Sequence, residues 1–244
     1  MPRAFHRLVV VSDAHLGAVP PDVEEAFLEF LDQVPSLGDG LLINGDLFGF
    51  WFAYRRAIPR AGIRVVTRIA ALARRIPVLM TGGNHDRWGA PFWEELGVWF
   101  DRAELRFTLG ESSALALHGD QIPGGGLGNR LKSRFFTSPI ASFGFRLLPP
   151  DLGFRIIAPL GAPARSPQAV ADEEATAARQ LAWVTALLRN GSSPGLVILG
   201  HSHRSAAVEI GPGRRYLNPG AWFDGYRYAV ATEGALELSQ YPAS

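Results

Sequence analysis

The histidines of this 244-residue chain are concentrated in short polar motifs, and this concentration constrains the fold more than any other feature of the sequence. Five of the six histidines lie in four such motifs, and a fifth motif carries aspartate without histidine. Each motif follows or completes an apolar stretch that reads as a buried strand. Because an open α/β sheet presents functional groups outside the carboxyl ends of its strands, we expect the motifs to meet in space. The motifs are Ser12-Asp13-Ala14-His15, Asn44-Gly45-Asp46, Gly83-Asn84-His85-Asp86, Leu117-His118-Gly119-Asp120 and Gly200-His201-Ser202-His203.

The first hundred residues alternate between strand and helix patterns. Residues 8–11, 41–43 and 78–80 are short apolar runs, which predict buried strands. Residues 21–34 and 65–76 carry apolar side chains at helical spacing between these runs. This regular alternation predicts an α/β sheet.

After residue 101 the pattern changes toward β structure. Residues 105–109 and 114–117 predict two strands paired around a turn, and the second leads directly into His118. Together with the first half of the chain, these strands predict two packed sheets flanked by helices. The remaining predicted strands are 196–199, 208–210, 215–217 and 228–231.

Carboxylate, amide and imidazole groups in these motifs predict a site for two divalent metal ions. This mixed set of ligands suits Mn²⁺, Fe or Zn²⁺ better than Mg²⁺ or Ca²⁺, which prefer oxygen ligands alone. Two such ions about 3.5 to 4 Å apart can clamp a phosphoryl group and lower the pKa of a bound water to about 7. One carboxylate usually bridges the ions, and Asp46, which follows the apolar run 41–43, is the candidate.

Each motif taken alone also has a structural interpretation. A lone histidine is more often a structural residue than a ligand, and a residue such as Asn84 could belong to a turn or a helix cap. Asp86 could cap a helix that starts near Trp88, and Asp120 could orient His118 by accepting a hydrogen bond. The sequence alone does not decide whether Asp86 and Asp120 have these structural roles.

Length and composition agree with a soluble enzyme. With 244 residues and 47% hydrophobic content, the chain can form a single large α/β domain, residues 1–244. No apolar run approaches the roughly 18 residues that a transmembrane helix needs. The start of the chain has no signal-peptide layout, because its apolar stretch 8–11 is too short. The absence of cysteine excludes disulfides and thiolate metal sites and agrees with a cytoplasmic location.

Residues 121–167 form an insert that the predicted metal site does not need. The insert is rich in large apolar residues, and its six basic side chains and one acid give it a charge of +5, against +1 for the whole chain. This combination predicts a cap for an anionic substrate with apolar chains, and an anionic membrane surface as a partner. Arg130, Lys132 and Arg134 are its expected substrate-binding residues. The alternative is a structural helical hairpin whose aromatic side chains pack on the sheets and whose arginines are solvated.

The ordered motifs resemble those of the calcineurin-like metallophosphoesterase superfamily. The series D-x-H, G-D, G-N-H-D, H-G-D and G-H-x-H spans about residues 12–204, and five ordered motifs are far more specific than any one of them. The resemblance implies a four-layer α/β/β/α sandwich, with the insert as a helical cap. It implies that Asp13, His15 and His203 hold the first metal, that Asn84, His118 and His201 hold the second, and that Asp46 bridges both.

The same resemblance implies which residues act on the substrate. His85 would face the substrate phosphate and hold no metal, and there it could donate a proton to the leaving oxygen. Asn84 and Arg204 are also expected to contact the substrate. Mn²⁺ is the expected metal, with Fe or Zn²⁺ as alternatives.

Other stretches resemble the UDP-2,3-diacylglucosamine diphosphatase branch of this superfamily. They are residues 45–52, the insert, 150–155, 200–204 and 217–222. This resemblance implies hydrolysis of the pyrophosphate of a UDP-linked, doubly acylated sugar to UMP and a lipid sugar 1-phosphate, a step of lipid A biosynthesis. It places the protein in the cytoplasm, peripherally associated with the inner face of the cell membrane. One departure is His85, where the best-known members of the branch have arginine.

Two alternatives stand beside this interpretation. The first is a nucleotide phosphodiesterase or nuclease of the same superfamily, which the low net charge and the lack of a long basic stripe disfavour, so nucleic acid is not an expected partner. The second is a non-catalytic peripheral membrane protein with a decayed site, which the complete set of predicted ligands disfavours.

Overall fold

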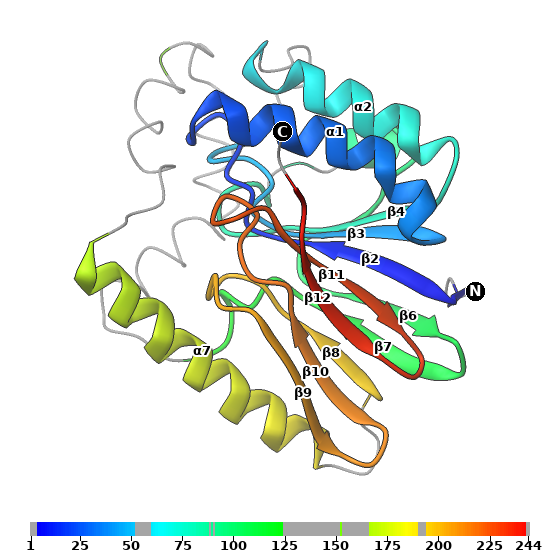
Figure 1. Cartoon of the computed structure of the whole chain (residues 1–244), viewed down its shortest axis with the longest axis vertical. Helices are drawn as coiled ribbons and strands as arrows, with labels where there is room; N and C mark the ends of the chain where they lie inside the picture. The colour runs from blue at the N-terminus through cyan, green and yellow to red at the C-terminus, as the bar shows by residue number, and fades with distance from the viewer. Residues whose placement is uncertain are drawn as a thin grey trace.

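The computed structural model describes residues 4–51, 60–87, 89, 91–123, 152, 166–189 and 194–242, and these form two six-stranded sheets packed face to face (Figure 1). The strands are β1 (Ala4–Phe5), β2 (Arg7–Val11), β3 (Gly40–Asn44), β4 (Val78–Thr81), β5 (Trp99–Asp101), β6 (Leu105–Leu109), β7 (Ser112–Ala116), β8 (Leu196–Ile198), β9 (Ala206–Gly211), β10 (Arg214–Asn218), β11 (Arg227–Thr232) and β12 (Leu236–Gln240). The helices are α1 (Pro21–Leu37), η1 (Arg60–Gly62), α2 (Ile63–Ala73), α3 (Phe92–Glu95) and α7 (Pro167–Leu188).

The first sheet has the strand order β12-β11-β2-β3-β4-β5. Strands β2 to β5 are parallel, whereas β11 pairs antiparallel with β2, and β12 pairs antiparallel with β11 at the edge of the sheet. Helices α1 and α2 cover the outer face of this sheet (Figure 1), where Phe27, Phe30 and Ile69 pack against Val9 and Met80. The predicted alternation of strand and helix is confirmed.

The second sheet has the order β1-β6-β7-β8-β10-β9. Its inner face packs against the first sheet, where Phe107, Ile198 and Leu217 meet Leu8 and Leu79. Strands β6 and β7 form the antiparallel pair that the sequence predicts. Because side chains alternate between the faces of a strand, β2 supplies Leu8 and its neighbour Val9 to two different cores.

Helix α7 covers the outer face of the second sheet (Figure 1). Val184 and Leu188 of this helix pack against Leu115, Val197 and Tyr216 of the sheet. The molecule therefore has the layer order helix, sheet, sheet, helix, and the predicted four-layer α/β/β/α sandwich is confirmed.

Two further sequence predictions concern the insert and the absence of a membrane-spanning helix. Of the insert 121–167, only 121–123, 152, 166 and 167 are described, so its predicted helical cap lies outside the described residues. Among the helices that are described, none combines the length and the apolar character needed to cross a membrane.

The sheet topology brings five strand ends to one region. Strands β2, β3 and β4 are neighbours in parallel register, and so are β7 and β8 of the other sheet. The carboxyl ends of each parallel group therefore lie at the same edge of its sheet, which is where α/β sheets present functional groups. The five polar motifs follow these strands or lie at their ends.

Candidate metal centre

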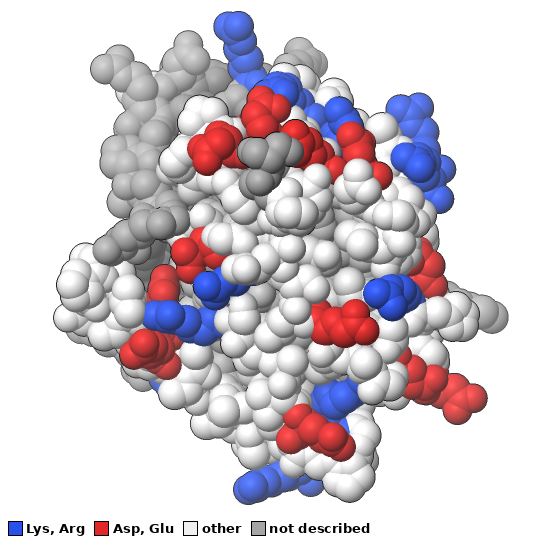
Figure 2. Space-filling view, in the orientation of Figure 1, with Lys and Arg blue, Asp and Glu red and all other residues white. Residues whose placement is uncertain are grey.

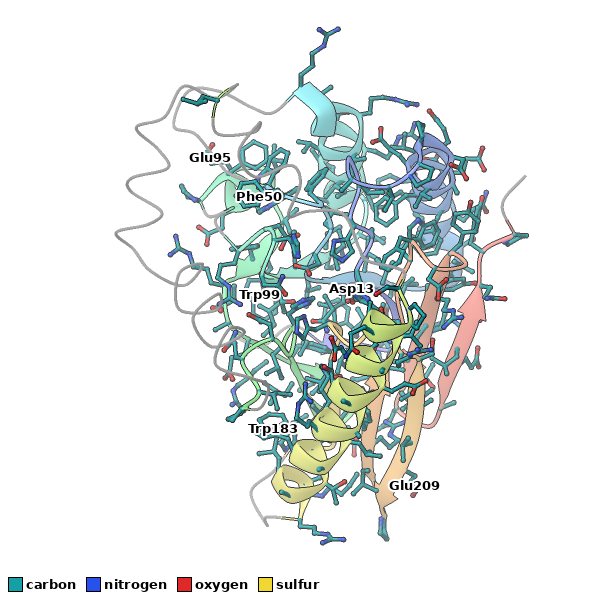
Figure 3. All side chains as sticks on the ribbon, turned by 90° about the vertical axis from the view of Figure 1, so that its left-hand side faces the viewer. Asp13, Phe50, Glu95, Trp99, Trp183 and Glu209 are labelled. Atoms are coloured by element: carbon teal, nitrogen blue, oxygen red, sulfur yellow. The ribbon has the colours of Figure 1, made fainter. Side chains whose placement is uncertain are left out.

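Hydrogen bonds from backbone amides tie the loops that carry Asp13, Asp46 and His201 to one another. The amides of Ala14 and His15 donate to the carbonyl oxygen of Asp46, at 2.9 and 3.0 Å. The two sheets are joined where the amide of His201 donates to both carboxylate oxygens of Asp13, at 3.2 and 3.0 Å. Figure 3 shows Asp13 close to the N-terminal end of α7, with Trp183 toward the other end of this helix.

Backbone strain is concentrated in the same loops. Among the described residues, six that are not glycine have a positive φ angle, and five of these six are predicted metal ligands. A non-glycine residue in the left-handed region costs energy and persists where its surroundings require that conformation, often at functional sites. The strained backbone therefore indicates that these loops fix the directions of the candidate ligand side chains. The five are Asp13 (φ 52°), His15 (φ 49°), Asp46 (φ 52°), His201 (φ 66°) and His203 (φ 57°).

The first cluster of candidate ligands contains Asp13, His15 and His203. One donor atom from each of these residues lies within 4.8 Å of the others. The distance from Nε2 of His203 to Oδ1 of Asp13 is 3.4 Å. All three residues are those that the sequence assigns to the first metal.

The second cluster contains Asp46, His118 and His201, whose donor atoms also lie within 4.8 Å of one another. Oδ2 of Asp46 lies 3.3 Å from Nε2 of His118 and 3.9 Å from Nε2 of His15. The carboxylate of Asp46 thus lies between the two clusters, which is the position that a bridging ligand requires.

Several buried nitrogen and oxygen atoms of the candidate ligands lack a hydrogen-bond partner in the structure. They are Nδ1 and Nε2 of His15, Nε2 of His118 and Oδ1 of Asn84. Buried polar atoms are nearly always paired, because an unpaired one costs about 1–3 kcal/mol. A divalent ion in each cluster would bind these unpaired nitrogen and oxygen atoms. Imidazole, amide and carboxylate groups are suitable ligands for such ions, so the side chains fit two ions.

His85 lies beside the first cluster. Its Nδ1 is 2.6 Å from the carbonyl oxygen of Gly49, and because a carbonyl can only accept, Nδ1 carries a proton. Its Nε2 therefore faces the site, 3.9 Å from Oδ2 of Asp46. His15, Asp46 and His85 form a third group within the same 4.8 Å limit. The ring thus presents Nε2 toward the same group of side chains as the candidate metal ligands.

Burial keeps two of the site histidines neutral. It lowers the pKa of His15 to about 3 and the pKa of His201 to about 4. A neutral imidazole has a free lone pair, which is the form that binds a metal. These two rings are thus ready for coordination at neutral pH.

Two other histidines hold protons in the absence of metal. Burial lowers the pKa of His118, but the carboxylates of Asp46, Asp13 and Asp120 together outweigh burial and raise this pKa to about 10. Burial also lowers the pKa of His203, whereas the carboxylates of Asp13 and Glu173 raise it to about 9. The protons balance the negative charge of buried carboxylates that metal ions would otherwise neutralise.

Metal binding at pH 7 is therefore expected to release protons. His118 and His203 are protonated below their raised pKa values of about 10 and 9 and must lose a proton to bind a metal. The apparent affinity for Mn²⁺ should accordingly rise with pH through neutrality. Calorimetric titration in buffers of different protonation enthalpy measures the release directly. An affinity that stays constant between about pH 6 and pH 8 would contradict the prediction.

Asp86 has a structural role that differs from the helix cap suggested by the sequence. Its carboxylate accepts hydrogen bonds from the amides of Leu47 at 2.7 Å, Gly83 at 2.8 Å and Asp46 at 3.3 Å. It thereby ties the loop after β3 to the loop after β4. The first described helix after it, α3, begins only at Phe92.

Asp120 does not orient His118 as the sequence suggested. Nδ1 of His118 lies 2.9 Å from the carbonyl oxygen of Asn44, which takes that orienting role. Asp120 instead pairs with the buried Arg87, whose Nη2 lies 2.6 Å from Oδ2 of Asp120. This ion pair links the loops after β4 and β7, and the sequence motifs gave no indication of it.

Asn218 and Gln180 are buried residues of the site region that the sequence analysis did not identify. Both donate a hydrogen bond to the carbonyl oxygen of Gly200, at 3.1 and 2.9 Å. Asn218 also donates to Oγ of Ser202 at 3.0 Å. Together they fix the loop that carries His201 and His203.

The predicted substrate-binding residues have different surroundings. Arg204 lies against α7, with Nε 3.4 Å from Glu173, Nη2 3.5 Å from Glu174 and Nη2 donating to the carbonyl oxygen of Val170 at 3.4 Å. These contacts hold its guanidinium by protein groups, and contact with substrate stays a prediction. The predicted residues Arg130, Lys132 and Arg134 lie outside the described residues.

Three comparisons with known proteins give matches over most of the chain. The family model described as calcineurin-like phosphoesterase matches residues 6–205. A protein of Shewanella pealeana named UDP-2,3-diacylglucosamine hydrolase is 28% identical over 242 residues, covering 97% of this chain and 98% of that protein. A protein of the same name from Shewanella piezotolerans is 26% identical with the same coverage. Among solved structures, the phosphoesterase Yfce from E. coli matches with a TM-score of 0.44 and 16% identity, covering 97% of this chain and 100% of that one.

Proposed function

The chain belongs to the calcineurin-like phosphoesterase family, and from this premise we propose that it hydrolyses the pyrophosphate of UDP-2,3-diacylglucosamine. As a member of the family it is a metal-dependent phosphoric ester hydrolase. The proposed products are UMP and a diacylated sugar 1-phosphate, and the reaction belongs to lipid A biosynthesis.

The observation that best supports this substrate is the extent of the similarity to proteins named UDP-2,3-diacylglucosamine hydrolase. The similarity covers 97% of the chain and 98% of the Shewanella pealeana protein, and so extends well beyond the five polar motifs. We accordingly treat residues 1–244 as a single domain, with 121–167 as a cap insert within it.

The two clusters support six of the seven proposed metal ligands, and the seventh, Asn84, is supported by its buried Oδ1, which has no hydrogen-bond partner. We assign Asp46 to both ions, and Mn²⁺ is the expected metal. When bound, two such ions supply Lewis acidity toward the phosphoryl oxygens and an activated water at neutral pH. The assigned ligands are Asp13, His15 and His203 for the first ion, and Asn84, His118 and His201 for the second.

His85 is proposed to act on the leaving group. Its Nδ1 proton is held by the carbonyl oxygen of Gly49, so Nε2 is the nitrogen that can exchange a proton with a substrate. The oxygen of a water attacks one phosphorus and the bond from that phosphorus to the bridging oxygen breaks. His85, when it carries a proton on Nε2 as well as on Nδ1, gives the Nε2 proton to the leaving phosphate oxygen. The proton that the attacking water loses replaces the one that His85 gives up. Such general acid catalysis contributes typically about 10²- to 10⁴-fold in rate.

Incubation of the purified protein with Mn²⁺ and UDP-2,3-diacylglucosamine in detergent micelles tests the proposed substrate. Mass spectrometry should detect UMP and the lipid sugar phosphate in equal amounts, and a chelator should stop their formation. The matched comparison is single-stranded DNA under the same conditions. Cleavage of DNA with no release of UMP from the lipid would overturn the proposal in favour of a nuclease.

The distribution of charge does not favour a nucleic-acid substrate. Figure 2 shows basic and acidic side chains interspersed on the face that it presents, with no continuous basic stripe among the described residues there. Proteins that bind nucleic acid usually gather Lys and Arg on one face to contact phosphates. A nuclease therefore stays the less supported alternative.

The insert is proposed to dock the protein on the inner face of the cell membrane and to favour lipid-linked substrates. Polybasic segments gain about 1 kcal/mol per Lys or Arg near an anionic leaflet, and salt screens this gain. Changing Arg130, Lys132 and Arg134 to glutamate should weaken binding to anionic liposomes and slow turnover of the lipid, while a small soluble diester is turned over nearly as before. Parallel loss of both activities, or unchanged sedimentation with anionic liposomes at low salt, would contradict the proposal.

A further inference from the structure

Helix α7 carries two polar residues on the side that faces the rest of the protein. Gln180 is buried together with Val184 and Leu188. Glu173 precedes Gln180 by seven residues, which is about two helical turns and places both on the same side of the helix. A helix that lies on a sheet normally presents apolar side chains there. Glu173 and Gln180 are therefore unusual residues for this side of the helix.

Both polar side chains contact the loop that follows β8. Gln180 donates to the carbonyl oxygen of Gly200 at 2.9 Å. Oε1 of Glu173 lies 2.8 Å from Nδ1 of His203, and the two side chains are only 22% and 17% exposed. On the other side of the same ring, Nε2 of His203 lies 3.4 Å from Oδ1 of Asp13.

We propose that Glu173 is a positioning residue of the metal centre, which holds the ring of His203 so that Nε2 faces the first ion. The inference rests on the proposed function only in taking His203 as a metal ligand. A carboxylate can only accept, so Nδ1 of His203 carries a proton, and Nε2 is the nitrogen that is left to give up its proton and bind the ion. A carboxylate partner of this kind orients a metal-binding histidine and increases its basicity.

The other site histidines show why this contact is distinctive. Nδ1 of His118 faces the carbonyl oxygen of Asn44, and Nδ1 of His85 faces that of Gly49, so both have uncharged acceptors. Neither nitrogen of His15 has a hydrogen-bond partner. Of the site histidines in the described part of the chain, His203 alone has a carboxylate hydrogen-bonded to Nδ1.

The backbone conformation of His203 is a second reason to expect that helix α7 supports this residue. His203 has a φ of 57°, in the strained left-handed region, at the end of a loop that approaches α7. Arg204 extends this contact, because its Nη2 donates to the carbonyl oxygen of Val170 in α7. Gln180, Glu173 and Val170 thus hold the loop from Gly200 to Arg204 at successive points along one helix.

The test compares Glu173→Ala and Glu173→Gln with Glu174→Gln as the matched control. Glu174 is the neighbouring acid, is 67% exposed and contacts Arg204, but no contact joins it to His203. Titration of the metal-free proteins with Mn²⁺ against a competing chelator measures the affinity of each ion. Thermal unfolding of the metal-free variants checks that the fold is retained.

Glu173→Ala should weaken one of the two ions about 10- to 100-fold and leave the other near wild type. Glu173→Gln should lose less, because its amide oxygen can still accept the proton of Nδ1. Glu174→Gln should bind both ions as the wild type does. Wild-type affinities for both ions in Glu173→Ala would overturn the proposal. So would an equal loss at both ions with a lowered unfolding temperature, because that pattern indicates a merely structural role.

Failure of the proposed function would look different. If the wild-type protein binds two ions but does not hydrolyse UDP-2,3-diacylglucosamine, the substrate assignment fails, and the affinity measurements still decide the role of Glu173. If the wild type is active, saturating Mn²⁺ should restore most of the turnover of Glu173→Ala, since the variant lacks ion affinity and not a group that contacts the substrate.

Discussion

Asp46→Asn is expected to abolish both the paired occupancy of metal and the hydrolytic activity. The carboxylate of Asp46 lies 3.3 Å from His118 and 3.9 Å from His15, so it faces both clusters. Asparagine keeps the shape but removes the charge that two cations would share. Bound metal contributes several kcal/mol of transition-state stabilisation. Because about 1.4 kcal/mol corresponds to a tenfold change in rate, we expect a loss of at least about 10³-fold. Elemental analysis and turnover of the same sample measure both effects.

Asp86→Asn is the matched control for this variant. Asp86 is also a buried aspartate of the same region, but its hydrogen bonds go to the backbone amides of Asp46, Leu47 and Gly83. It should therefore retain two metals and lose less activity than Asp46→Asn. Retention of two metals by Asp46→Asn would refute the bridging assignment.

His85→Ala is expected to keep its metal content near that of the wild type and to lose roughly 10²- to 10⁴-fold in rate, the range typical of general acid catalysis. The reason is the orientation of the ring, because the contact of Nδ1 with the carbonyl oxygen of Gly49 leaves Nε2 free to face a substrate. A diester with a p-nitrophenol leaving group needs little protonation, so its hydrolysis should be less affected.

The outcome of this experiment separates two roles for His85. The ring lies in a group with His15 and Asp46 within 4.8 Å, so ligation of the first ion is the competing role. Loss of one metal equivalent together with activity would move His85 into the ligand shell. An equal loss of rate for activated and unactivated leaving groups would also contradict general acid catalysis.

The sequence predicted the strands of the centre well because buried parallel strands are short apolar runs without polar interruption. Residues 8–11, 41–43 and 78–80 fall within β2, β3 and β4. The pattern was less informative for β12 at the edge of the first sheet, where only Leu236 and Ser239 of five residues are even partly buried. Edge strands lack the strong apolar signal on which such predictions depend.

Helix α7 was not located from the sequence, and its burial pattern explains the omission. Its buried residues are Gln180, Val184 and Leu188, a narrow stripe in a helix of 22 residues. Much of its remaining surface is alanine, which favours helix but gives no amphipathic pattern. Glu173 and Gln180 are polar residues on the side of the helix that faces the protein. The sequence therefore shows no continuous apolar face from which the helix could be predicted.

The candidate ligands were predictable because each lies in a short motif beside a strand. Their supporting contacts were not, because they join residues far apart in the chain. Glu173 meets His203 across 30 residues, and Arg87 meets Asp120 across 33. No local spacing encodes such a contact, so only the packing of loops and helix reveals it.

Hydrolysis of bis(p-nitrophenyl) phosphate during stepwise addition of Mn²⁺ to the metal-free protein, with the bound metal counted at each step, tests the two-metal centre most directly. The account predicts that activity reaches its maximum only when two ions are bound per chain, and that a chelator reverses it. Full activity with one ion per chain, or activity that persists in the chelated protein, would contradict it.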